Sequence, residues 1–221
     1  MKLWGGTLTW IAVCTLSSIL IGGGVILAQT TGPVTLTLEG HGVFFSREAN
    51  QAVAIDPQVF VQAGGASAGV GPQNITHAAG FVPARLADPP NTPLYNADGK
   101  PLSFTLGQWL GARGTVSIEL RGQETQVRVS LSGLVPNGVY SLFRVTFQPT
   151  GNTFAPLDGA GTANNFMAAA DGTASVTVST PTPQTHANGV VLVYHSDGQA
   201  HGIERGTPGI TAHHQLIARV P

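Results

Sequence analysis

Alternation of apolar and polar residues constrains the fold of this chain more than any other feature. In GTVSIELRG (114–122) and TQVRVSLSG (125–133), apolar side chains occupy every second position. A period of two places successive side chains on opposite faces of an extended chain, so each stretch predicts a half-buried strand. Gly122-Gln123 between them predicts a hairpin connection.

Short strands of this kind continue to the C-terminus, with turn residues every eight to twelve positions. Pro136-Asn137-Gly138 predicts one turn, and Asp171-Gly172 predicts a hairpin within NNFMAAADGTASVTVSTP. GVVLVYH (189–195) is the most apolar stretch, as expected of a central strand that is buried on both faces. The pattern predicts an all-β protein, a sandwich or a barrel.

The N-terminal half of the mature chain is less regular. PVTLTLEGHGVFF (33–45) and AVAIDPQVFVQ (52–62) alternate and predict two further strands. Residues 63–103 are rich in Gly and Pro, which indicates either a functional loop or short elements that the pattern does not reveal. Within them, Asp98-Gly99 predicts a tight turn. TLGQWLGA predicts a helical turn capped by Thr105, with Leu106, Trp109 and Leu110 buried.

Residues 1–28 differ from the rest of the chain. Lys2 is their only charge, and a long apolar run leads to a small residue at Ala28, as in a signal peptide cleaved after that position. Retention of residues 4–27 as a membrane anchor is the alternative, because about 20 apolar residues can span a bilayer. Either outcome predicts that residues 29–221 form one domain, secreted, periplasmic or at the cell surface. Cleavage removes Cys14, the only cysteine, so the mature chain has no disulfide of its own.

Charge and motifs exclude several classes of function. The chain carries 10 Lys+Arg and 11 Asp+Glu, a formal net charge of −1. No basic patch supports binding to nucleic acid. The sequence has no nucleophile elbow, no phosphate-binding loop and no favoured pair of catalytic carboxylates. It therefore favours a non-catalytic protein whose partner is an extracellular ligand or protein of unidentified kind.

Several of these motifs resemble copper/zinc superoxide dismutase-like sandwiches over about residues 114–221. GTVSIEL, QVRVSLSGLVPNGVY and NNFMAAADGTASVTV are similar to that family's strand pair, Gly-Leu-x-Pro-Gly turn and Gly-x-Ala stretch, and GVVLVYHSDGQAHG to its Val-Val-His strand end. The resemblance implies an antiparallel Greek-key sandwich, here with extra N-terminal strands and a long Gly/Pro loop. It gives His195 the position of a copper ligand. The motifs also resemble those of uncharacterised secreted microbial proteins.

Departures from the family's pattern weaken the functional side of this resemblance. In VYSLFRVTF, Phe143 and Val145 stand where the family has two copper-binding histidines, and neither can bind a metal. The stretch QPTGNTFAPLDGAGTANN offers Asp158 but none of the expected zinc-binding histidines. A redox copper site needs several imidazoles. Dismutase activity at the family's position is therefore excluded, and Asp158 is expected to order its loop rather than bind calcium.

Histidines supply the remaining chemistry. Five of the seven lie in the last 36 residues. His195, Asp197 and His201 surround one turn, and His214 joins them if the closing strand pairs beside His195; neutral imidazoles with a carboxylate suit zinc or copper. His213 and His214 point to opposite faces of a strand, so at most one takes part. The alternative is a set of turn residues bonded to the backbone. His41 and His77 are expected to be structural or solvated.

Two hypotheses follow. The first is a secreted, non-catalytic β-sandwich module for binding or structure, with a degenerate superoxide dismutase-like site and no cofactor. The second is an extracytoplasmic copper- or zinc-binding protein that uses the metal ligands His195, Asp197, His201 and His214.

Overall fold

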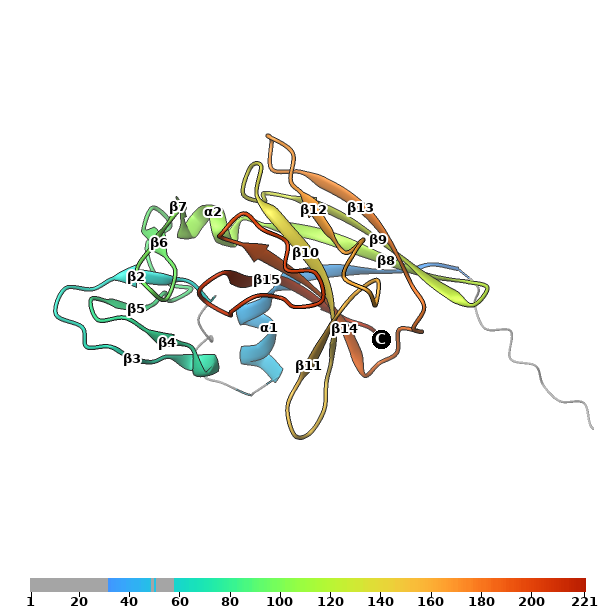
Figure 1. The fold of residues 1–221 in the computed structure, drawn as a ribbon, viewed down its shortest axis with the longest axis horizontal. Coiled ribbons are helices and arrows are strands. Elements are labelled where there is room, and N and C mark those ends of the chain that lie inside the picture. The colour runs from blue at the N-terminus through green and yellow to red at the C-terminus, as the bar shows by residue number, and fades with distance from the viewer. Residues whose placement is uncertain (1–31, 49, 51–57) are drawn as a thin grey trace, which may run out of the picture. The chain divides into compact units, whose positions relative to one another are not determined.

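A computed structural model of the protein describes residues 32–48, 50 and 58–221. The expected signal peptide or anchor, residues 1–28, lies outside the described residues. The predicted all-β class is confirmed, because antiparallel strands form most of the regular structure (Figure 1). Among the described residues, no helix is long and apolar enough to cross a membrane.

Nine of the described strands form one sheet in the order β11-β10-β14-β15-β1-β8-β9-β13, with β12 paired to β10. Their bounds are β1 Val34–Gly40, β8 Arg113–Arg121, β9 Glu124–Ser132, β10 Val139–Thr146, β11 Thr153–Pro156, β12 Asn165–Met167, β13 Ala174–Thr180, β14 Asn188–His195 and β15 Ala212–Arg219. The hairpin predicted at Gly122-Gln123 is present between β8 and β9.

Strand β1 connects the two halves of this sheet. Val34 to Leu38 pair with β8, whereas Glu39 and Gly40 pair with β15. One apolar core receives side chains from both halves, including Val116, Val129, Leu142, Leu192 and Leu216. The sheet therefore curls so that its two halves enclose a common core.

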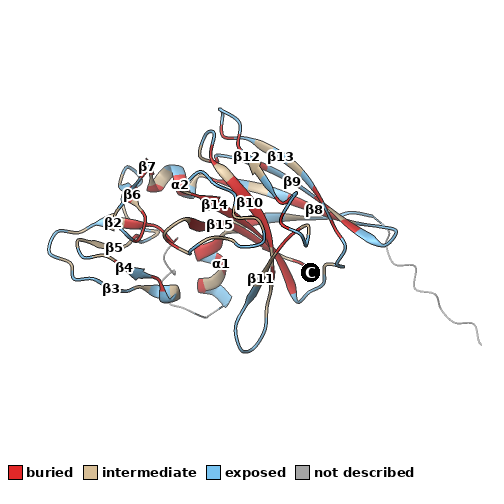
Figure 2. Ribbon diagram, viewed as in Figure 1, coloured by how far each residue is buried: buried red, intermediate tan, exposed pale blue. Residues whose placement is uncertain are grey.

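Strand β14 is buried along its whole length, as predicted for GVVLVYH (Figure 2). It lies between β10 and β15, so both of its edges are hydrogen-bonded. Alternate side chains enter different apolar clusters: Leu192 and Tyr194 face the common core, and Val191 and Val193 face the opposite side. His195 therefore continues the face of Val191 and Val193.

Helix α1 (His41–Glu48) covers that opposite face. The prediction that a strand continues through HGVFF is wrong: pairing of β1 with β15 ends at Gly40, and a helix begins at the next residue. Phe44 is 1% exposed and packs into a cluster on the sheet. The other buried members of this cluster, called here the outer cluster, are Phe143, Val145, Val191, Val193, Ala212 and Ile217.

Residues 63–103 contain short elements rather than one open loop. A four-stranded sheet has the order β5-β2-β6-β7, and β3 pairs with β4. The bounds are β2 Phe60–Gln62, β3 Gly69–Val70, 3-10 helix η1 Pro72–Asn74, β4 Thr76–His77, β5 Phe81–Pro83, β6 Pro93–Tyr95 and β7 Pro101–Thr105. Asp98-Gly99 makes the predicted tight turn between β6 and β7, with Gly99 at a φ of +83°.

Helix α2 (Leu106–Leu110) begins as predicted. The Thr105 hydroxyl accepts a hydrogen bond from the Gln108 backbone, and the Gln108 side chain accepts one from the Thr105 backbone. Leu106 and Trp109 are buried, but Leu110 is 42% exposed, contrary to the prediction.

The hairpin predicted at Asp171-Gly172 is wrong, although a turn is present there. Strand β12 pairs with β10, and β13 pairs with β9 in the other half of the sheet. The chain thus crosses between halves at this turn. Register along β13 places Val176 and Val178 opposite Val129 and Val127, which fits the common core.

Candidate metal-binding site

The C-terminal end of β14 places His195 inside the protein. His195 pairs with Val139 of β10 and Ala212 of β15 and is 1% exposed. Its Nε2 lies 2.8 Å from Oγ of Ser141, a buried residue of β10. Its buried Nδ1 has no hydrogen-bond partner among the described residues. A buried polar atom without a partner destabilises the folded state, so the position of this nitrogen calls for an explanation, such as a bound ligand.

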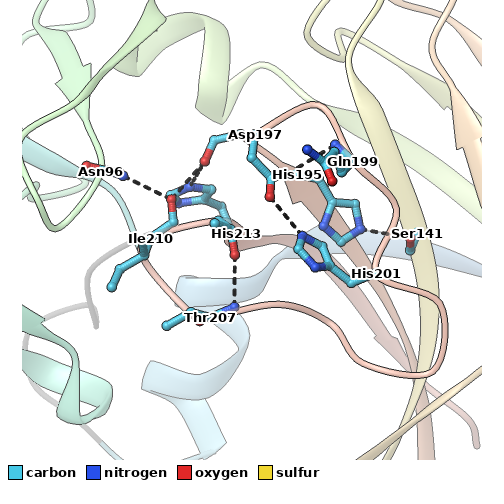
Figure 3. Close-up of polar contacts among 11 residues, drawn as sticks. Asn96, Ser141, His195, Asp197, Gln199, His201, Thr207, Ile210 and His213 are labelled. Carbon is cyan, nitrogen blue, oxygen red and sulfur yellow. Dashed lines mark hydrogen bonds and ion pairs between the residues drawn. The ribbon is translucent and has the colours of Figure 1, made fainter.

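A tight turn after β14 brings Asp197 and His201 back to this ring (Figure 3). The Gly198 amide donates to the His195 carbonyl at 3.2 Å, and Gly198 has a φ of +73°, which glycine adopts without steric cost. Asp197 accepts the Gln199 amide on Oδ1 and lies 3.0 Å from His201 Nε2 through Oδ2. The rings of His195 and His201 are 5.2 Å apart between centroids.

The three side chains form a group that can hold a metal ion. One ligand atom from each lies within 4.8 Å of the other two. Since Nε2 of His195 is directed at Ser141, Nδ1 is the nitrogen it can offer. Two imidazoles and a carboxylate are a common set for zinc, with a fourth position left for water or another ligand. Metal-bound imidazoles usually give their second nitrogen to an oxygen acceptor, the role that Ser141 fits.

Electrostatics keep His195 in the form that binds metals. Burial, and then the nearby His201, lower the pKa of His195 to about 4. The ring is therefore neutral at pH 7. With Ser141 Oγ accepting from Nε2–H, the lone pair resides on Nδ1.

His214, predicted to join this site, is not a member of the group of three. It lies on β15 opposite Val193, and its ring turns toward other partners: Arg205 at 3.0 Å and His41 at 3.1 Å. His213 points to the other face, with Nδ1 2.9 Å from the Gln58 carbonyl. The expectation that neighbouring His213 and His214 diverge agrees with these contacts.

Other predicted residues have structural surroundings. Asp158 accepts hydrogen bonds from the backbone amides of Gly161, Thr162 and Ala163, so its carboxylate orders its own loop as expected. Phe143 and Val145 lie in the outer cluster, where they pack with Phe44. His77 is buried, with its ring 5.8 Å from that of Phe60.

Sequence reasoning missed two residues that shape this region. Ser141 carried a signal, since it is the polar residue within the apolar run VYSLF. His41 was expected to be structural or solvated; it is buried and contacts His214, 173 positions away. A pattern of neighbouring residues cannot predict a contact across that separation.

No model of a known protein family matches the chain, and no curated protein matches it. The likeness to copper/zinc superoxide dismutase-like sandwiches therefore stays a prediction. What the site does must be argued from its own residues.

Proposed function

We propose that this protein is an extracytoplasmic β-sheet module that binds one divalent transition-metal ion, zinc or copper, through His195, Asp197 and His201. The observation that carries the proposal is the Nδ1 atom of His195, which is buried beside an imidazole and a carboxylate and has no hydrogen-bond partner in the described part of the chain. A ligand that accepts a lone pair would satisfy this atom. Secretion is part of the proposal and rests on the signal-like sequence of residues 1–28.

The proposed ligand set differs from the one the family resemblance implies. In the family, two copper ligands lie on the strand that corresponds to β10. Here that strand has Phe143 and Val145 at those positions, and both pack in the outer cluster. Only His195 is shared. We therefore propose metal binding at a set built by the turn after β14, not dismutation. Any ion held there keeps a coordination position that no described side chain of the group supplies.

The second candidate is the non-catalytic module without a metal. It is favoured by the contact between His201 and Asp197, which holds the turn as an ordinary ion pair when His201 is protonated. In that case His195 serves packing alone. The two candidates differ in one measurable property, stoichiometric metal binding.

The test is a calorimetric titration of the purified, chelator-stripped protein with ZnCl₂ and with CuCl₂. The proposal expects binding of one ion per chain. His201→Ala and Asp197→Asn should each weaken it by about tenfold or more, because each removes one of three ligands. Both residues lie toward the surface, so the fold should survive.

His186→Ala is the matched control, because His186 is an exposed histidine outside the site. It should leave the affinity unchanged. Binding that falls equally in this control, or weak binding that neither site variant alters, would reject the metal site in favour of the metal-free module.

A further inference from the structure

A polar cavity lies on the same side of the sheet as helix α1. Its volume is about 430 Å³. Side chains from α1, η1, β11, β15 and the 205–208 segment line it, among them His41, Asn74, Asn152, Phe154, Arg205 and His214. It shares no lining residue with the group of His195, Asp197 and His201. It is therefore a separate candidate site.

Arg205 gives this cavity a positive charge. Its guanidinium lies 3.7 Å above the centre of the Phe154 ring, and Nη1 is 3.0 Å from Nε2 of His214. Among the described residues, no carboxylate lies within ion-pair distance of Arg205. An aromatic face and a neutral imidazole orient this guanidinium without neutralising it, which leaves N–H groups suited to an anion.

The contact with Arg205 fixes the hydrogen of the neutral His214 ring. A guanidinium can only donate, so Nε2 of His214 accepts and the proton of this ring is on Nδ1. Nδ1 of His214 lies 3.1 Å from Nε2 of His41 and 3.3 Å from the side-chain amide nitrogen of Gln58. Nδ1 of His41 is buried and has no partner among the described residues.

The neutral ring of His214 cannot bind a metal in this arrangement. Neither nitrogen of His214 retains a lone pair for an ion, since one accepts from Arg205 and the other carries hydrogen. Burial, and then the charge of Arg205, lower the pKa of His41 to about 3, so this ring is neutral. The cavity thus offers a cationic donor, Arg205, and the side-chain amides of Asn74 and Asn152.

The walls indicate what surrounds the anionic group. Phe45, Phe154 and Ile75 line the same cavity. Ligand sites of this volume typically combine apolar walls with a few oriented polar groups. We propose that this cavity binds a small organic carboxylate, with its carboxylate on Arg205 and its apolar part against the two phenylalanines.

Binding of benzoate, measured by calorimetry on the chelator-treated protein, tests the proposal. Benzamide has the same shape without the charge. We expect one benzoate per chain at millimolar concentrations or below, and binding of benzamide weaker by about tenfold or more. Absence of benzoate binding, or equal binding of both compounds, would overturn the proposal.

Two variants locate the site. Arg205→Gln should weaken benzoate binding by about tenfold, whereas Arg85→Gln, which removes an exposed charge elsewhere, should not. Asn152→Asp provides a test that leaves the Arg205 packing intact, since Asn152 is exposed and the change preserves its shape. The new carboxylate should repel benzoate and lower its affinity. Benzoate binding unaffected by Asn152→Asp and Arg205→Gln alike would place the ligand elsewhere and refute the assignment.

Discussion

At the scale of single residues, the contact with Ser141 sets the orientation of the His195 ring. Its hydroxyl oxygen lies 2.8 Å from Nε2, which orients the ring and leaves Nδ1 toward Asp197 and His201. Ser141→Ala should therefore lower zinc affinity by about tenfold to a hundredfold, as loss of such partners does at other metal sites. Calorimetric titration of the variant measures this. Ser130→Ala, at an exposed serine of β9, serves as the control; equal affinities in all three proteins would contradict this role for Ser141.

The same residues show which part of a site a sequence can predict. His195, Asp197 and His201 lie within seven positions of one another, and the Asp-Gly pair after a strand end predicts the turn that gathers them. His214 was assigned to the same group because β15 was expected beside β14, and it is beside it. Its ring instead contacts His41 and Arg205, and the local sequence pattern predicts neither contact.

At the scale of elements, Phe44 is the most buried apolar side chain by which α1 packs on the sheet. This side chain is 1% exposed, whereas its neighbour Val43 is 46% exposed. Phe44→Ala should lower the free energy of unfolding by about 3–5 kcal/mol, because it leaves a cavity in the outer cluster. Val43→Ala should change it by about 0.5 kcal/mol or less. Urea denaturation followed by circular dichroism measures both, and similar losses in the two variants would show that α1 does not depend on this contact.

This helix also explains where element prediction failed. Alternation in VTLTLEG continues in appearance through HGVFF, so a strand was expected to Phe45. The aromatic residues instead fit a helical spacing, with His41, Phe44 and Phe45 separated by three and four positions. Packing of Phe44 in the outer cluster favours the helix over the strand. In β8, β9 and β14 the strand prediction succeeded, because long runs of one period left no competing interpretation.

At the scale of the whole molecule, burial of neutral histidines should make the free energy of unfolding fall as the pH is lowered. Burial is the main cause that lowers the pKa of His41 to about 3 and of His213 to about 4, and His214 is lowered well below its usual value. In the unfolded chain these rings titrate near a pKa of 6.5. Between these values the unfolded state binds more protons than the folded state. Stability is therefore fully present above about pH 6.5 and is lost as the pH falls toward 4.

His213 provides the sharpest measurement of this effect, since it lies outside both proposed sites. Its contribution between pH 6.5 and 5.0 is about 2 kcal/mol if the folded ring stays neutral. The loss of unfolding free energy between pH 7.5 and 5.0, measured by urea denaturation with chelator present, should thus be smaller by about that amount in His213→Gln. His186→Gln should keep the dependence of the unaltered protein, because this histidine is exposed in both states. A flat stability profile over this range would mean that the buried rings bind protons equally in the folded and unfolded states, which contradicts the lowering of their pKa values by burial.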